Sequence, residues 1–183
     1  MNIRPMNQAD INAVLTLMTL GDPYVKPRTE SDYWLYAKLF SSTTPLTFID
    51  GQLVGVIVAF RSQDNPSEIY VQDVMVRPNF RRRGVATELL NSVIAQGQAW
   101  DCRRLFLTSE PENNAAHVAW LSYGFENLPG NMIERGVQVQ SDYKGPGKHR
   151  AIYEYRIVSP SRGHGCRERW DDPATPHSSP LRS

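Results

Sequence analysis

The chain has 183 residues, 40% of them hydrophobic, which supports one domain with a real core and leaves too little for a second full domain. Its 20 basic and 19 acidic side chains give a net charge of +1, so no overall field attracts nucleic acid or an anionic membrane, and an anion site must be local. Cys102 and Cys166 lie far apart without a metal-type cysteine partner, and the start of the chain lacks a secretory leader pattern, so we expect a soluble cytoplasmic protein without disulfide or zinc.

The first half of the chain predicts strands and helices around an antiparallel hairpin. Asn7 and Asp10 form the pattern of a helix cap, and Thr29 precedes a second apolar helical run. Asp50 and Gly51 separate two apolar strands, as in a tight β-hairpin. The predicted elements in order are a strand at 2–6, a helix carrying Ile11, Val14, Leu15 and Met18, a helix at 30–40, and strands at 46–49, 53–60 and 69–77.

The second half predicts a crossover unit followed by a less regular region. A helix at 84–97 between strands at 69–77 and 103–108 predicts a local parallel pair. A further helix is predicted from Pro111 through Trp120. Two strands follow at 133–140 and 151–158, joined by a polar loop, 141–150, that could line a substrate mouth. Hydrophobic periodicity is lost after this, so we expect one domain at 1–158 and a disordered tail at 159–183.

The most informative segment joins the strand at 69–77 to the next helix. Arg81, Arg82 and Arg83 precede Gly84, at which an amphipathic run begins. Exposed N–H groups at a helix start, beside concentrated positive charge, form a binding site for a pyrophosphate. The single glycine of this loop, without a following Gly-Lys-Ser/Thr, matches neither a Walker P-loop nor a dinucleotide fingerprint. The alternative is a solvated basic loop before an ordinary helix.

The spacing Arg81-x-x-Gly84-x-Ala86, after an apolar-x-Val strand end, resembles the acetyl-CoA signature of the GNAT superfamily of N-acetyltransferases. The resemblance covers residues 2–158 and implies an α/β (α+β) fold with a mixed central sheet of about six to seven strands, two of them splayed and parallel, flanked by about four helices. It also implies that acetyl-CoA is the cosubstrate and that its diphosphate is bound by main-chain amides. The residues implied for cofactor binding are Val74, Met75, Val76, Arg81, Arg82, Arg83, Gly84, Val85, Ala86, Thr87, Asn113, Ala116 and Trp120.

A second motif, at 113–125, is similar to the Asn-x-x-Ala-x-x-x-Tyr-x-x-x-Gly-Phe pattern of this family. The matching residues are Asn113, Ala116, Gly124 and Phe125. Trp120 takes the tyrosine position. In the family that tyrosine often protonates the departing thiolate of coenzyme A, whereas an indole N–H is at best a hydrogen-bond donor. Tyr123, about one helical turn further on, is a candidate to replace it, with core packing as the alternative role for both rings.

Candidate catalytic carboxylates lie on the strand before the arginine segment. Acetyl transfer to an amine requires a base that takes a proton from the ammonium ion, the form that predominates at pH 7. Glu68 and Asp73 are the only carboxylates of this strand. In a regular strand they face opposite sides of the sheet, although a bulge near the cofactor would change this facing. The alternative is a surface Glu68 and an Asp73 bonded to the backbone.

The segment 67–87 looks like that of the aminoglycoside 3-N-acetyltransferases, and polyamine and streptothricin acetyltransferases similarly place an aspartate just before the apolar-x-Val element. Residues 33–76 show a looser likeness to diaminobutyrate acetyltransferases. These relatives acetylate cationic, amine-rich small molecules. In polyamine enzymes a glutamate base precedes the aspartate, but Gln72 stands there in this chain. The likeness therefore implies that Asp73 holds or deprotonates the substrate amine, with Glu68 as the second candidate.

The resemblance implies transfer of an acetyl group from acetyl-CoA to a primary amine of a small molecule, by direct attack in a ternary complex and without a metal. Two alternatives stay open: a non-catalytic acyl-CoA-binding module, which Trp120 and Gln72 both permit, and a protein amine as the acceptor. The near-neutral net charge opposes a nucleic-acid partner at the arginines. Many relatives form homodimers, and the resemblance leaves that state open for this chain.

Overall fold

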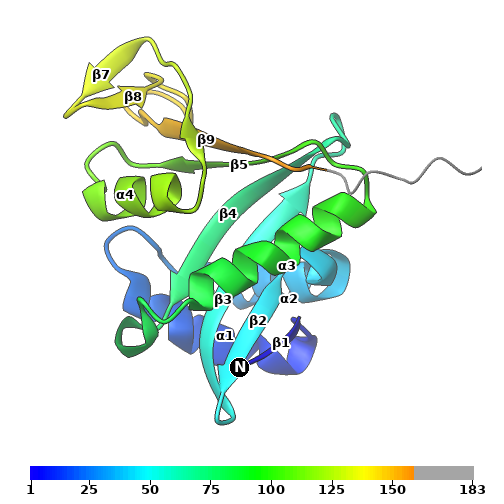
Figure 1. Ribbon diagram of the computed structural model, residues 1–183. Helices are drawn as coiled ribbons and strands as arrows, with labels where there is room; N and C mark the ends of the chain where they lie inside the picture. The colour runs from blue at the N-terminus through cyan, green and yellow to red at the C-terminus, as the bar shows by residue number, and fades with distance from the viewer. Residues whose placement is uncertain (159–183) are drawn as a thin grey trace, which may run out of the picture.

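The structure, a computed structural model, describes residues 1–158 and consists of a mixed β-sheet with helices on both faces (Figure 1). Seven strands lie in the order β1-β2-β3-β4-β5-β9-β6, and β7 and β8 form a separate hairpin. The strands are β1 (Asn2–Pro5), β2 (Pro45–Ile49), β3 (Gln52–Arg61), β4 (Glu68–Val76), β5 (Arg104–Ser109), β6 (Glu126–Asn127), β7 (Met132–Glu134), β8 (Val137–Val139) and β9 (Ala151–Arg156). The α-helices are α1 (Ile11–Met18), α2 (Glu30–Leu39), α3 (Val85–Ala99) and α4 (Asn114–Ser122).

Capping residues set where the chain enters α1 and α2. The side chain of Asn7 accepts a hydrogen bond from the amide of Ala9 at 2.9 Å, and the side chain of Asp10 accepts one from the amide of Asn7 at 2.9 Å. Thr29 and Asp32 form the same reciprocal arrangement at the start of α2. Such capping boxes satisfy amides that have no helical acceptor. The cap at Thr29 therefore sets the end of the α1–α2 loop, which forms one wall of the cavity described below.

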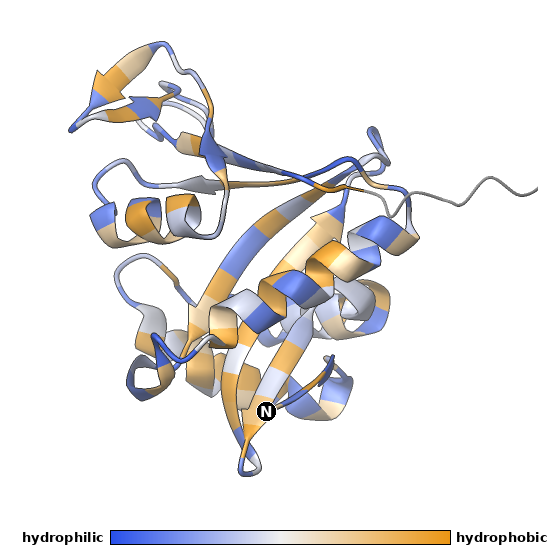
Figure 2. Cartoon of the chain, viewed as in Figure 1, coloured by the Kyte–Doolittle hydropathy of each residue, from blue (hydrophilic) through white to orange (hydrophobic). Residues whose placement is uncertain are grey.

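Two hydrophobic cores lie on opposite faces of the sheet. One contains Leu89 and Val93 of α3, and the other contains Val14 and Leu17 of α1. β3 is buried along most of its length because it contributes to both cores. Figure 2 shows mostly hydrophobic colour along the visible parts of this strand. Consecutive hydrophobic residues are typical of a strand that is covered on both faces, whereas hydrophobic and polar residues alternate in a half-exposed strand.

A bulge in β4 changes which way its side chains face. Consecutive residues of β3 pair with Val71 and Asp73, so Gln72 is an extra residue in β4. Before the bulge Val71 packs into the α3 core, whereas after it Met75 packs into the core of α1 and α2. Because facing alternates along a strand, Asp73 lies on the same face as Glu68. The opposite facing of a regular strand therefore does not hold, because the bulge that the sequence analysis allowed for is present.

The two parallel strands separate toward their carboxyl ends. β4 and β5 pair in register from Glu68 with Arg104 to Val71 with Leu107, and β4 then continues as far as Val76. Figure 1 shows the two strands diverging beyond this paired stretch. The predicted splayed parallel pair is confirmed.

The predicted order of elements is confirmed over most of the chain, with exceptions after α3. The segment 133–140, predicted as one strand, is the β7–β8 hairpin, because Arg135 (φ 51°) and Gly136 (φ 83°) form a left-handed turn within it. The two-residue strand β6 is too short to produce a sequence pattern. The tail predicted at 159–183 lies outside the described residues. Within residues 1–158, no helix combines the length and apolar character needed to cross a bilayer.

Candidate active site

The segment between β4 and α3 presents backbone amides at an exposed helix start. α3 begins at Val85, and the amide of Glu88 donates to the carbonyl of Gly84 at 3.0 Å. The N–H groups of Val85, Ala86 and Thr87 therefore precede the helical hydrogen-bond ladder. Gly84 has φ +78°, and no atom of the described residues lies within 4 Å of the position a Cβ would take. Backbone conformation thus requires glycine here, and space remains beside it for a ligand.

Positive charge surrounds this helix start. Arg81, Arg82 and Arg83 are all exposed. Arg81 Nε donates to the carbonyl of Val76 at 3.2 Å, and the Arg83 guanidinium lies 5.0 Å from the centre of the Phe80 ring. Arg82 (φ 60°) and Gly84 (φ 78°) both have left-handed backbone conformations, directly before the helix. Amides in such a turn, at the positive end of a helix dipole, match what a diphosphate requires.

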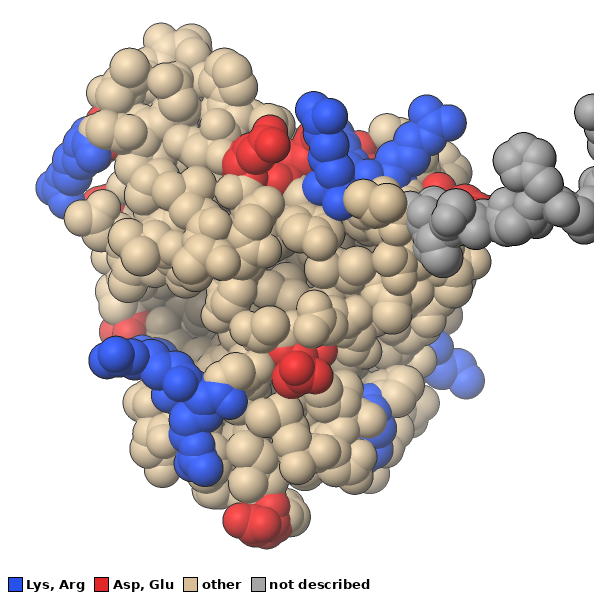
Figure 3. Space-filling model, viewed as in Figure 1, with Lys and Arg blue, Asp and Glu red and all other residues tan. Residues whose placement is uncertain are grey.

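A cavity of about 650 Å³ opens where β4 and β5 diverge. The bulged part of β4 and the carboxyl end of β5 line it, together with the α1–α2 loop, residues around the start of α4, and the loop at 141–150. Figure 3 shows a hollow in the surface with Lys and Arg side chains at its lower edge. The loop at 141–150, which the sequence suggested could line a substrate mouth, does line this cavity.

Asp73 is a largely buried carboxylate in the wall of this cavity. Its side chain is 13% exposed, and Arg28 Nε lies 3.6 Å from its Oδ2, an ion-pair distance rather than a hydrogen bond. Oδ2 is buried and has no hydrogen-bond partner among the described residues. Burial raises the pKa of the Asp73 carboxyl above its ordinary value, and the charges of Arg28 and Lys144 oppose this shift. Asp73 is therefore a largely buried carboxylate in the cavity wall, with one oxygen that makes no hydrogen bond to the described residues.

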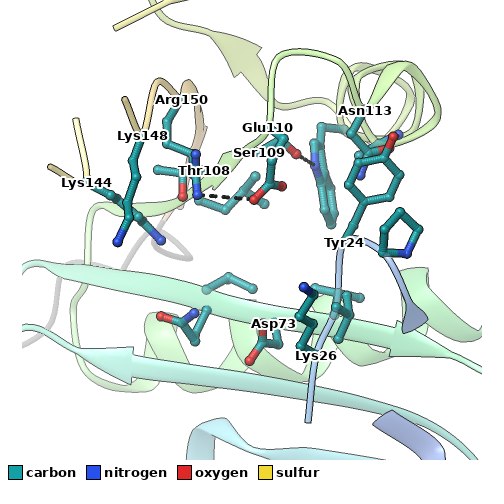
Figure 4. A pocket seen from close by; sticks show the side chains of 18 of the residues that line it. Tyr24, Lys26, Asp73, Thr108, Ser109, Glu110, Asn113, Lys144, Lys148 and Arg150 are labelled. Atoms are coloured by element: carbon teal, nitrogen blue, oxygen red, sulfur yellow. Dashed lines mark hydrogen bonds and ion pairs between the residues drawn. The ribbon is translucent and has the colours of Figure 1, made fainter. Parts of the chain in front are cut away.

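Basic side chains dominate the wall formed by the loop at 141–150. Figure 4 shows Lys144, Lys148 and Arg150 on one side of the cavity. Arg150 Nη2 lies 3.2 Å from Glu110 Oε1, and Lys144 Nζ donates to the hydroxyl of Tyr70 at 2.6 Å. The sequence interpretation placed this loop at a substrate mouth but named none of these residues. The available signal was three basic residues within a glycine- and proline-containing loop.

Glu68, the second carboxylate candidate, lies apart from Asp73. Arg104 Nε donates to Glu68 Oε2 at 2.8 Å, and Arg104 Nη1 donates to Glu154 Oε2 at 2.8 Å. Asn65 Nδ2 also donates to Glu68. Glu68 is not among the residues that line the cavity. The structure therefore places it in an ion-pair network that joins β4, β5 and β9.

The two aromatic candidates of the second motif, Trp120 in α4 and Tyr123 directly after it, lie in different places. Trp120 lines the cavity, and its Nε1–H donates to Ser109 Oγ at 3.3 Å. Asn113 and Ala116 line it as well, and the Asn113 side chain accepts from the Ala116 amide at 3.1 Å. Tyr123 instead lines a smaller recess of about 290 Å³ between α3 and α4. The structure thus brings Trp120 to Asp73's cavity and does not bring Tyr123 there.

The three predicted cofactor residues at the end of β4 differ in exposure. Val74 lines the cavity, whereas the Met75 side chain is 2% exposed and packs into the core of α1 and α2. Val76 pairs with Gly55 of β3. Toward β5, all three residues lie beyond the last residue pair of the two strands, Val71 with Leu107. Their main chain is therefore not paired with β5.

Comparison with known proteins gives a family match and several partial relatives. The model of the acetyltransferase (GNAT) family matches residues 14–125, more than half of the chain. L-2,4-diaminobutyric acid acetyltransferase from Nocardia farcinica is 29% identical over 84 residues, 46% of this chain and 44% of that protein. The protein of the same name from Methylotuvimicrobium alcaliphilum is 27% identical over 108 residues, 59% of this chain and 63% of that protein.

The likeness to aminoglycoside enzymes is weaker. Aminoglycoside N(6')-acetyltransferase type 1 from Salmonella typhimurium is 32% identical over 63 residues, 34% of this chain and 43% of that protein. The chain thus covers less than two thirds of the length of these curated relatives, between 43% and 63%.

Solved structures are similar over most of the chain. Diaminobutyrate acetyltransferase from Paenibacillus lautus, solved with L-2,4-diaminobutyric acid and coenzyme A, has a TM-score of 0.69 and 22% identity, covering 88% of this chain and 98% of that one. Ribosomal-protein-S18-alanine N-acetyltransferase from Escherichia coli has a TM-score of 0.63 and 16% identity, covering 90% and 99%. At such identities these likenesses show the fold alone. Together with the family match, they confirm the predicted fold, and the chain belongs to the acetyltransferase (GNAT) family.

Proposed function

We propose that this protein transfers the acetyl group of acetyl-CoA to a primary amine of a small molecule. The observation that carries the proposal is the placement of Asp73: a largely buried carboxylate, with one oxygen that no described residue hydrogen-bonds, in the wall of a cavity between two splayed strands. Membership of an acetyltransferase family supports the reaction class. The names of the partial relatives, which refer to diaminobutyric acid and aminoglycosides, support a small amine as the acceptor.

In this proposal the α3 start binds the cosubstrate. The amides of Val85 to Thr87 hold the diphosphate, and the exposed arginines at 81–83 supply positive charge. The pantetheine arm lies along the part of β4 that β5 does not pair with, and hydrogen-bonds to the main chain of 74–76. A main-chain N–H of this segment stabilises the oxyanion that develops on the thioester oxygen. The acetyl group is then delivered into the cavity that contains Asp73.

Asp73 acts on the acceptor. It accepts a proton from the acceptor ammonium, and a carboxyl whose pKa is raised by burial is better suited to this than an exposed one. The free amine forms a bond to the thioester carbonyl carbon, the carbon–sulfur bond breaks, and coenzyme A leaves as a thiolate. Trp120 donates its N–H to Ser109, which leaves the serine hydroxyl proton free for a hydrogen bond to the thiolate. The nitrogen loses its second proton as the carbon–sulfur bond breaks, and this proton passes through water to the thiolate, while Asp73 returns the first proton to solvent.

The test is release of thiol from acetyl-CoA across a panel of amines, with Asp73→Asn as the key variant. We expect the turnover number to fall by about 10²-fold, because the base is lost, while calorimetry gives an unchanged affinity for acetyl-CoA. The matched control is Asp64→Asn, in the exposed turn between β3 and β4, which should behave as the wild type. Equal turnover in Asp73→Asn would remove this residue from the mechanism.

A second candidate function is an acyl-CoA-binding module without turnover. It is favoured by Trp120, whose indole cannot deliver a proton in place of the tyrosine that the family pattern has there. The same assay separates the two functions. Acetyl-CoA binding by calorimetry, with thiol release from no member of the amine panel, would select the module.

A further inference from the structure

The cavity that contains Asp73 carries an excess of positive charge. Two carboxylates, Asp73 and Glu110, line it. The cations that line it are Lys26, Arg28, Lys144, Lys148 and Arg150. Five cations against two anions oppose the binding of an acceptor that is only cationic, because like charges repel within a cavity more strongly than in water. The amine-rich acceptor implied by the sequence resemblance fits this lining poorly.

Part of this positive charge is not neutralised by the protein. Arg150 is paired with Glu110, and Arg28 lies beside Asp73. Lys144 donates to the neutral hydroxyl of Tyr70, so its charge is not balanced by that contact. Lys148 has no side-chain partner among the described residues. The excess charge is thus located on Lys26 of the α1–α2 loop and on Lys144 and Lys148 of the loop at 141–150.

The proposed cosubstrate does not account for these lysines. Its diphosphate is placed at the start of α3, where Arg81, Arg82 and Arg83 supply the charge, and none of these three lines the cavity. The adenosine 3′-phosphate lies beyond the diphosphate, on the side away from the pantetheine arm. The pantetheine arm is uncharged. The lysines of the 141–150 loop therefore lie at the part of the cavity that is left for the acceptor.

The loop that carries the lysines is held by its own hydrogen bonds. The amide of Lys144 donates to the carbonyl of Lys148 at 3.2 Å, and the amide of Lys148 donates to the carbonyl of Gly145 at 2.9 Å. The amide of Gly147 donates to Asp142 Oδ1 at 2.7 Å. Figure 4 shows both lysines across the cavity from Asn113. Opposite charges are therefore presented in one cavity: Asp73 on β4 and the lysines on the loop.

We propose that the acceptor carries a carboxylate as well as its primary amine, and that Lys144 and Lys148 bind this carboxylate while Asp73 takes the amine. The inference rests on the function proposed above and narrows its substrate class to small aminocarboxylates, such as amino acids with a second amine. An ammonium and a carboxylate on one molecule match both charges of the cavity. Polyamines and aminoglycosides carry no carboxylate that the two lysines could bind.

Pairs of amines that differ only by a carboxylate test the inference. The pairs are L-2,4-diaminobutyrate with 1,3-diaminopropane, L-ornithine with putrescine, and L-lysine with cadaverine, and kanamycin and O-phosphoethanolamine complete the panel. We expect kcat/KM to be at least about tenfold higher for the carboxylated member of the preferred pair, the effect of one charge-assisted hydrogen bond. Preference for the amine without a carboxylate, for kanamycin, or for the phosphate would overturn the inference.

The matched variant is Lys148→Gln, alone and with Lys144→Gln. We expect KM for the carboxylated acceptor to rise about tenfold for the single variant, with kcat and the acetyl-CoA affinity retained. For the decarboxylated partner, KM should stay the same or fall. Lys38→Gln, on the exposed surface of α2 outside the cavity, is the control and should leave all constants unchanged. An equal change of KM for both members of a pair would contradict carboxylate binding.

The two proposals fail in different ways. Absence of thiol release with every amine would refute the acetyltransferase function. Turnover of polyamines or kanamycin in preference to every aminocarboxylate would leave that function standing and refute only the carboxylate site.

Discussion

Asp73 shows how the environment of one residue determines its chemistry. The same carboxylate on a regular strand would lie on the α3 face of the sheet, but the bulge at Gln72 turns it toward Arg28 and the cavity. There it is largely buried, and one of its oxygens accepts no hydrogen bond from the described residues. Glu68, on the same strand and the same face, is instead engaged by Arg104. The two carboxylates therefore differ in surroundings rather than in residue type.

The raised pKa of Asp73 predicts a pH dependence of stability. The folded protein binds more protons than the unfolded chain between the ordinary carboxyl pKa, about 3.9, and the raised value. The contribution of this residue to the free energy of unfolding therefore falls as pH rises through that window. Asp73→Asn lacks this fall, so its stability relative to the wild type should increase as pH is raised.

The measurement is urea unfolding of the wild type and Asp73→Asn at a series of pH values from acid to neutral. Asp64→Asn, in an exposed turn, is the control and should follow the wild type throughout. Parallel curves for the wild type and Asp73→Asn would contradict the burial of this charge.

At the scale of elements, the junction of β4 and α3 is the part of the protein that we propose binds the cosubstrate diphosphate. Arg82→Ala combined with Gly84→Asp should abolish acetyl-CoA binding. The second change places a negative charge at the diphosphate and strains a residue with φ +78°. Isothermal titration calorimetry measures the affinity.

Gly51→Asp is the matched control, since Gly51 also has a positive φ (+76°) and open space around its Cβ position, but lies in the β2–β3 turn. This variant should lose some stability and retain acetyl-CoA binding. Undiminished binding by the Arg82 and Gly84 double variant would refute the diphosphate site.

At the scale of the whole molecule, packing across the sheet positions the site. A Cβ at Gly55 of β3 would lie 2.7 Å from Val85 Cγ1 and 2.9 Å from Leu89 Cδ1, so the absence of a side chain lets α3 pack close to the sheet. Val85 is also the first residue of the helix whose amides we assign to the diphosphate. The sheet therefore sets the position of the α3 start relative to the cavity.

Gly55→Val should displace α3 and so lower both the stability of the fold and the affinity for acetyl-CoA. We expect the free energy of unfolding to fall by about 1–3 kcal/mol through overpacking, together with a weaker acetyl-CoA affinity. Gly51→Ala, which strains a turn remote from α3, should lower stability by about 1 kcal/mol and leave the affinity unchanged. Thermal unfolding and calorimetry on the same samples separate the two effects. An unchanged affinity in Gly55→Val would show that the α3 start is positioned independently of this contact.

Local patterns predicted most of the elements well, including the helix that starts after the arginine segment. The caps at Asn7 and Thr29, the Asp50-Gly51 turn and the Arg81-x-x-Gly84 spacing act over a few residues, so they can be read directly from the chain. Local patterns failed where a short element has no periodicity, as in β6, or where a turn interrupts an apolar run, as in the β7–β8 hairpin.

The sequence by itself determined the family, the sheet with its crossover, and the segment that presents amides at a helix start. Only the tertiary structure decided which charged residues share a cavity. Asp73 lies on a bulged strand, Arg28 in the loop before α2, and Lys148 in the loop before β9. Asp73 and Lys148 meet because β4 pairs with β5 and β5 pairs with β9, and Arg28 joins them because α1 and α2 pack against β4. The physical reason is that cavity charge depends on contacts between distant segments, whereas caps, turns and periodicity depend on neighbours along the chain.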